Sequence, residues 1–104
     1  MIKLLSFVAA CLIGSSATVS FAADAAITGP VLSVYEDGFR IADDKAQAIR
    51  VFAWNLCGDS TRDYIARGDR VTVEGDREWR MLDARSVMKA DGTPACPASA
   101  APQY

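Results

Sequence analysis

Arg50, Phe52 and Trp54 occupy alternate positions and place a guanidinium group next to two aromatic rings. Arg40 lies in an earlier segment that alternates in the same way. Guanidinium groups beside aromatic faces can stack on bases or sugars, at ~1–3 kcal/mol per stack, and can pair with phosphates. These four residues predict a binding platform. The alternative is structural: Phe52 and Trp54 would pack under the tail or a short helix, and both arginines would be solvated.

A second group lies near the connection between the last two predicted strands, where Arg77, Trp79 and Arg80 are close in sequence. These residues could contact a ligand at that turn. Asp76 and Glu78 interleave with them. This spacing favours local salt bridges, worth ~0–1 kcal/mol each, over an anion site.

Acidic residues gather at Glu36-Asp37 and Asp43-Asp44 and could form a rim that attracts cations. Their spacing lacks the Asp-x-Asp-x-Asp-Gly pattern of a calcium loop, so we predict no metal site. The chain has no histidine. A Ser-His-Asp triad, a Cys-His pair and a histidine-ligated metal or haem are therefore excluded.

The length of 104 residues supports one domain. With 11 Lys/Arg and 13 Asp/Glu the formal net charge is −2, and 51% of the residues are hydrophobic. A dedicated duplex-DNA binder would carry a broad basic surface, so this class is disfavoured. No pattern in the sequence indicates a cofactor.

Residues 1–22 are typical of a cleaved signal peptide. Lys3 precedes an apolar stretch (residues 4–13), and small residues stand at the −3 and −1 positions of the cleavage site. Cleavage after Ala23 or Ala25 is an alternative. A membrane anchor would need about 20 apolar residues, more than this segment offers. We expect a periplasmic or secreted protein without a membrane span.

Cleavage would remove Cys11 and leave Cys57 and Cys96, an even pair in an oxidising compartment. A bridge between them would close a loop of about 40 residues, worth ~4 kcal/mol in the chain-entropy model. The alternative, a reactive thiol, lacks CxxC spacing and a histidine that would lower the thiol pKa. We predict a structural disulfide.

Alternation of apolar and polar residues at period two predicts strands. They cover about residues 27–35, 39–42, 48–54, 70–74 and 79–89. Asp59 or Ser60 is predicted to cap a short helix that runs to about Ala66. Its Tyr64 and Ile65 should face inward. The predicted barrel core is Phe39, Ile41, Ile49, Val51, Val71 and Val73.

Interruptions of the alternation predict the connections. Residues 75–78 should form a turn because they begin with Gly75-Asp76. In the last strand the alternation slips by one residue, which suggests a bulge. From Asp91 onward Gly, Pro, Ala and Ser predominate. Residues 91–104 should therefore be a disordered tail, except where Cys96 ties it down.

Five strands with a short helix between the third and the fourth predict an all-β fold, a small OB-type Greek-key β-barrel over residues 23–90. In such folds the outside of the second and third strands and the last turn are the usual places for ligands. Some OB-type nucleases use carboxylates, arginines and calcium, and those residue types occur here in Asp43, Asp44, Arg40 and Arg85. They need further helices to build a cleft, so we predict that the chain is not an enzyme.

Two stretches follow a known pattern. The first three strands contain Gly29-Pro30-Val31, Glu36-Asp37, Asp43-Asp44 and Ile49-Arg50-Val51. Residues 68–75 read GDRVTVEG, and a segment from Asp76 to Trp79 follows. Together, over residues 27–90, they resemble the bacterial OB-fold family of small periplasmic stress-tolerance proteins, the YgiW/YdeI type.

The resemblance implies a non-enzymatic periplasmic role in tolerance of stress or of cationic toxic compounds. The chain departs from the family in its Cys57/Cys96 pair and in the short leader before its first hairpin. We expect an exported binding protein that holds a small polar, anionic or cationic ligand, or an oligomeric one. The alternative is an interaction domain that docks a larger envelope protein through an exposed strand face.

Overall fold

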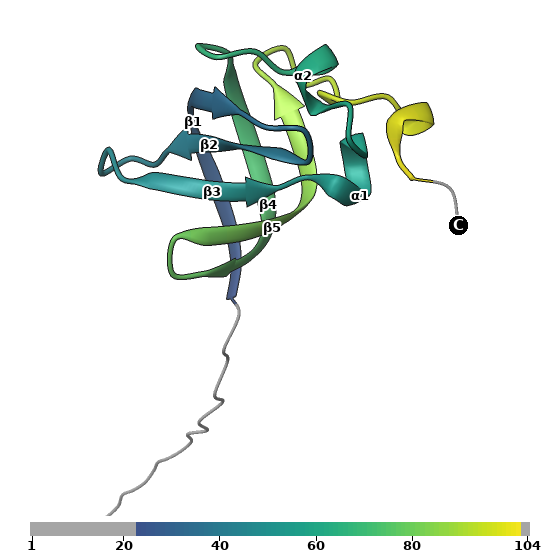
Figure 1. The fold of residues 1–104 in the computed structure, drawn as a ribbon. Coiled ribbons are helices and arrows are strands. Elements are labelled where there is room, and N and C mark those ends of the chain that lie inside the picture. The colour runs from purple at the N-terminus through teal and green to yellow at the C-terminus, as the bar shows by residue number, and fades with distance from the viewer. Residues whose placement is uncertain (1–22, 103–104) are drawn as a thin grey trace, which may run out of the picture.

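Five strands close into a barrel (Figure 1). The structure, a computed structural model, describes residues 23–102, so the predicted signal peptide lies outside the described residues. The strands are β1 (Ala23–Val34), β2 (Gly38–Ala42), β3 (Ala48–Phe52), β4 (Arg70–Glu78) and β5 (Met81–Lys89). Around the barrel their order is β1-β2-β3-β5-β4, and β4 pairs back onto β1. This order, with β3 parallel to β5, is the predicted OB-type Greek-key barrel.

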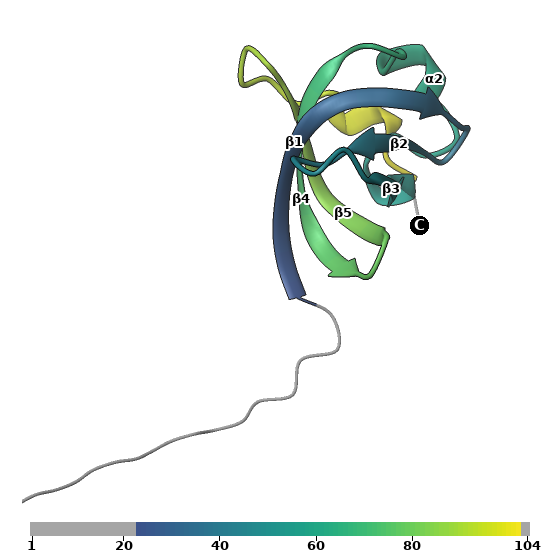
Figure 2. The ribbon, with the colours of Figure 1, turned by 90° about the vertical axis from the view of Figure 1, so that its left-hand side faces the viewer.

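The barrel interior holds the six residues that the alternation predicts. Phe39, Ile41, Ile49, Val51, Val71 and Val73 are each at most 1% exposed. Side chains alternate across a strand, so a register that buries one of these residues buries its neighbour two positions away. Figure 2 shows how β1 lies along β4 and then bends over toward β2, which closes the sheet on itself.

Within residues 23–102, three short helices lie outside the strands: α1 (Trp54–Cys57), α2 (Thr61–Tyr64) and the 3-10 helix η1 (Ala98–Ala100). The predicted helix corresponds to α2, which is shorter and begins without a side-chain cap from Ser60. The prediction that the third strand reaches Trp54 was wrong. That strand ends at Phe52, because Ala53 has a ψ of 20°, outside the extended region, and Trp54 begins α1. Within residues 23–102, no helix has the length and apolar character to cross a membrane.

The turn between β4 and β5 lies later in the chain than predicted. Residues 75–78 continue β4, and the turn consists of Trp79 and Arg80. Gly75 is needed for close approach, because a Cβ there would clash with the Asp83 carbonyl oxygen of β5. The predicted bulge is confirmed: Glu74 pairs with Ser86 and Gly75 with Ala84, so Arg85 is the extra residue.

The predicted tie of the tail at Cys96 is present, and the segment held against β5 begins before Cys96. Pro94 forms a bridge with Met88, and the Ala95 amide donates to the Val87 carbonyl at 2.8 Å. Ala95 is 5% exposed and belongs to the core. Composition alone suggested disorder, but a backbone ladder and a covalent tie hold this segment against β5.

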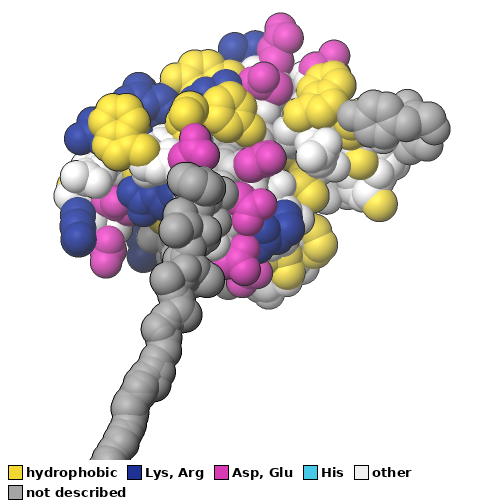
Figure 3. Space-filling view, turned by 90° about the horizontal axis from the view of Figure 1, so that it is seen from below, with side chains coloured by type: hydrophobic (Ala, Val, Ile, Leu, Met, Phe, Trp, Pro, Cys, Tyr) yellow, Lys and Arg dark blue, Asp and Glu magenta, His cyan; other side chains and the backbone are white. Residues whose placement is uncertain are grey.

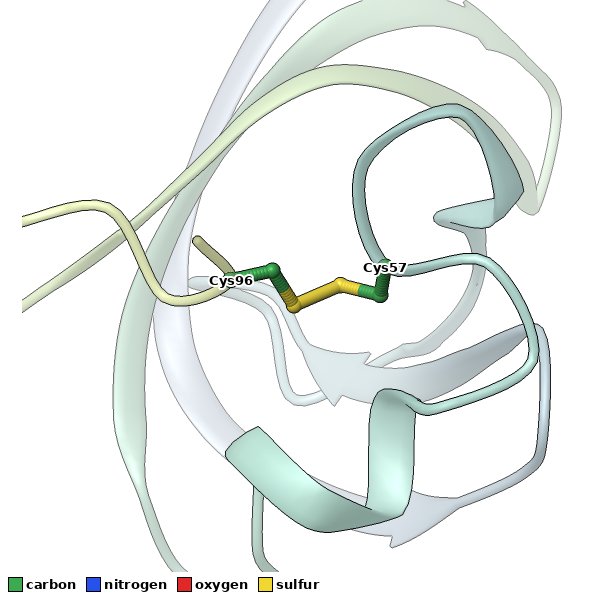
Figure 4. Close-up of a disulfide and its surroundings, with 2 residues drawn as sticks. All are labelled: Cys57 and Cys96. Atoms are coloured by element: carbon green, nitrogen blue, oxygen red, sulfur yellow. A yellow bond between two sulfur atoms is a disulfide. The ribbon is translucent and has the colours of Figure 1, made fainter. Parts of the chain in front are cut away.

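That tie is the predicted disulfide between Cys57 and Cys96 (Figure 4). The two Cα atoms lie 5.4 Å apart, within the range for a disulfide, and the residues are 39 positions apart in sequence. It joins α1, which follows β3, to the segment after β5. A disulfide in so small a domain fits an oxidising environment.

A buried hydroxyl at the start of α2 gives a test of the packing. Thr61 is fully buried, and its Oγ1 finds no hydrogen-bond partner among the described residues. Thr61→Val keeps the shape and removes the unsatisfied group, so we expect the free energy of unfolding to rise by about 1 kcal/mol. Urea unfolding would measure it, with Thr61→Ser, which keeps the hydroxyl, as the control. A less stable Thr61→Val protein would contradict the prediction.

Candidate ligand-binding site

The outer face of β2, β3, β5 and β4 carries Arg40, Arg50 and Phe52 of the first predicted group. One row of paired residues crosses these strands as Arg40, Arg50, Met81 and Glu78. The next row contains Phe52, Asp83 and Asp76. The face is therefore basic over β2 and β3, apolar at its centre and acidic over β5 and β4. Figure 3 shows hydrophobic and basic side chains together along one edge of the molecule, next to a group of acidic side chains.

Arg50 is the best-held side chain of this face. Its guanidinium group lies 4.3 Å from the ring centre of Tyr35 and 4.6 Å from that of Phe52. It also donates to Asp37 Oδ1 at 3.0 Å and to the Val51 carbonyl at 2.8 Å. Cation–π contacts and charge-assisted hydrogen bonds thus engage most of the Arg50 guanidinium group. Arg50 is better placed to fix the Phe52 ring than to receive an anion.

Tyr35 extends this stack from the connection between β1 and β2. The Ser33 hydroxyl donates to its phenol oxygen at 3.3 Å. That hydrogen bond, together with the nearby charges of Arg40 and Arg50, lowers the pKa of Tyr35. Arg40 itself is exposed. Trp54, the fourth predicted platform residue, is 43% exposed but lies on α1, beyond the end of β3.

The second predicted group is brought together at the β4–β5 turn. Arg77 Nε donates to the Trp79 carbonyl at 2.7 Å, and the Arg80 guanidinium lies 5.3 Å from the Trp79 ring centre. Trp79 has a φ of 56°, a region that favours glycine, and its side chain is 78% exposed. Both features are unfavourable for a bulky apolar residue. An outlier of this kind points to a functional reason for the residue.

A depression of about 450 Å³ lies between the two groups, lined by Phe52, Met81, Asp76, Glu78 and Asp83. Its volume falls in the range of small-ligand sites, about 300–1,000 Å³. Phe52 and Met81 are 36% and 45% exposed, so the floor presents apolar surface to solvent. Sequence reasoning missed Met81 and Asp83, because their i, i+2 spacing places them on one face of the last strand but does not show that this strand pairs with β3.

The carboxylates around the depression differ in what they contact. Asp76 and Asp24 both accept hydrogen bonds from Arg85, at 2.7 and 2.9 Å. Glu78 and Asp83 make no ion pair within residues 23–102. The predicted local salt bridges of Asp76 and Glu78 with their neighbouring arginines do not form there.

In the predicted acidic rim, Asp43 is held by contacts within its own turn and by Arg77. Asp43 Oδ1 accepts from the backbone amides of Gln47 and Lys45 at 2.8 and 2.9 Å, which lowers the pKa of this carboxyl. Arg77 lies 3.8 Å from the other oxygen of Asp43. Among the described residues, no group of three or more acidic or cysteine side chains is placed to hold a metal ion. Asp43 thus has a structural role in its turn.

The fold and this face define a small all-β OB-type barrel with an aromatic and acidic depression on its surface. Comparisons with protein-family models, curated proteins and solved structures found no match to this chain. The resemblance to the bacterial OB-fold family stays a prediction, and the chemistry of the site rests on its own residues.

Proposed function

We propose that the protein is an exported, non-enzymatic OB-fold binding module whose ligand is a small cation with an apolar group. The observation that carries this proposal is the depression on β3, β5 and β4, where Phe52 and Met81 form the floor. Glu78 and Asp83 border it without an ion pair among the described residues.

The charges of the protein residues around the depression favour a cationic ligand over an anionic one. An anionic ligand would need a cation beside it, but the residues that line the depression include no Arg or Lys, and the nearby Arg50 is already engaged by Asp37 and two aromatic rings. A cationic ligand would instead pair with Glu78 and Asp83 while its apolar part covers Phe52. The resemblance to the stress-tolerance family is compatible with such a ligand.

Export to the periplasm or the medium is part of the proposal. The disulfide supports an oxidising compartment. Cleavage after Ala22 would leave β1 whole, whereas cleavage after Ala25 would remove Asp24 and its hydrogen bond with Arg85. We therefore favour Ala23 as the mature N-terminus. The intact mass of the exported protein would establish it.

A thermal-shift screen of nucleotides, glycans, metal ions and amines should show the largest stabilisation with amphiphilic amines. For the probe 2-phenylethylamine, we expect Phe52→Ala and Asp83→Asn each to weaken binding by about tenfold, since each removes a direct contact. Binding should also weaken with salt, because exposed charges are screened over about 10 Å at 0.1 M.

Leu32→Ala is the matched control. The exposed fraction of Leu32, 38%, is similar to the 36% of Phe52, and Leu32 does not line the depression. This variant should bind like the wild type. If Phe52→Ala and Asp83→Asn also bind the amine like the wild type, or if only anions stabilise the protein, the proposed site is wrong.

Trp79 favours a second candidate function, docking of a larger envelope protein. A tryptophan held at the tip of a hairpin and 78% exposed is typical of an anchor residue in an interface. Trp79 is not among the residues that line the depression. Trp79→Ala should therefore leave amine binding unchanged but abolish cross-linking to an envelope protein in intact cells, if this candidate holds.

A further inference from the structure

β4 begins and β5 ends at the end of the barrel opposite the β4–β5 turn (Figure 1). The residues at these two strand ends line a second groove. It has a volume of about 390 Å³, and its polar lining is Thr28, Thr72, Arg70 and Lys89. We propose that this groove binds a sugar that carries a single anionic group, a carboxylate or a phosphate. The site is separate from the depression near the β4–β5 turn and does not depend on the proposed function.

Two cations supply the charge for this ligand. Arg70 and Lys89 are exposed, and neither makes an ion pair within residues 23–102. Arg70 begins β4 and Lys89 ends β5 at the same end of the barrel, and both residues line the groove. A guanidinium group can bind a carboxylate or a phosphate through two parallel hydrogen bonds, and an ammonium group adds a point charge. Together they suit one anionic group.

Two hydroxyls and a thioether suit the sugar ring. Thr28 Oγ1 and Thr72 Oγ1 lie 2.8 Å apart and share one hydrogen bond. In such a pair one hydroxyl donates to the other, so the second keeps its hydrogen for a ligand oxygen. Met88, the ladder partner of Thr72, adds a half-buried apolar side chain to the wall. Hydroxyl partners beside an apolar wall match the alternating polar and C–H surfaces of a sugar.

The neighbouring carboxylates limit the ligand to one anionic group. Asp69 and Asp91 line an adjoining depression that shares Arg70 and Lys89 with the groove. Asp69 accepts from the Ala66 amide at 2.9 Å. Asp91 accepts from the Thr93 hydroxyl at 2.6 Å and from its amide at 2.9 Å. Both carboxylates are therefore fixed, and they would repel the further charges of a polyanion that extended in that direction.

Titration of the isotope-labelled mature protein with glucose 6-phosphate, glucuronate, glucose and inorganic phosphate tests the site by NMR. We expect saturable shifts around residues 70–72 and 88–92 with the two anionic sugars. Glucose and inorganic phosphate should each bind about tenfold or more weakly, because each lacks one half of the contacts. Glucose 6-phosphate and glucuronate separate a phosphate-bearing from a carboxylate-bearing ligand.

Arg70→Gln combined with Lys89→Gln should weaken binding of the anionic sugars by about tenfold or more. Arg62→Gln is the matched control, since Arg62 is an exposed cation on α2 outside the groove. Phe52→Ala should also leave sugar binding unchanged. Any one of three results would overturn the proposal. The first is that millimolar sugar causes no shifts in the groove, and the second is that the double variant binds the anionic sugars as the wild type does. The third is that inorganic phosphate binds as tightly as glucose 6-phosphate.

Discussion

Val73→Asp should prevent the domain from folding. Val73 is fully buried, and its ladder partners are Ile27 on β1 and Val87 on β5. A carboxylate at this point would be surrounded by apolar side chains, and burying an unpaired charge costs several kcal/mol or more. The total stability of a domain is only about 5–15 kcal/mol. Circular dichroism and thermal melting of the purified variant would measure the effect.

Leu32→Asp is the control for this substitution, since it places the same charge on an exposed apolar position. That variant should fold and melt close to the wild type. A Val73→Asp protein that is soluble, with wild-type circular dichroism and melting temperature, would show that the side chains of β4 face the other way.

Loss of the Cys57–Cys96 bridge should be the second large effect. The bridge spans 39 positions, and in the chain-entropy model such a loop contributes ~4 kcal/mol. Reduction, or replacement of both cysteines by alanine, should therefore lower the melting temperature by several degrees or more. Thiol titration of the unreduced, denatured protein should find almost no free thiol.

The double alanine variant is also the control for the reductant, because its melting temperature should not change when reductant is added. Two free thiols per chain in the exported protein would refute the disulfide. An unchanged melting temperature after complete reduction would instead show that the bridge contributes little stability.

The core of the barrel could be predicted from the sequence because alternation in a strand has a strict period of two. Phe39 with Ile41 and Val71 with Val73 are buried as expected. The end of β4 could not be predicted in this way. Gly75 suggested a turn, but its lack of a side chain serves a close approach of β5. The true turn contains Trp79 and no glycine, so local turn preferences did not indicate it.

The candidate site was only partly predictable, because it combines residues of one strand with residues of a strand far away in the sequence. Arg50 and Phe52 were expected on one outer face and do stack there. Met81 and Asp83 join them only because β5 begins after the displaced turn and runs parallel to β3. That pairing links segments far apart in the chain, and no local pattern encodes it. The salt bridge of Arg50 with Asp37 likewise depends on the tertiary fold.

The disulfide also determines how the barrel would respond to mechanical force. Cys96 follows β5, and its partner Cys57 follows β3, the parallel neighbour of β5. Tension applied to the C-terminal end of the chain would therefore pass through the sulfur–sulfur bond to α1 and β3. It would bypass β5, which lies inside the covalent ring. The barrel is consequently protected from being peeled open, one ladder hydrogen bond at a time, from its C-terminal strand.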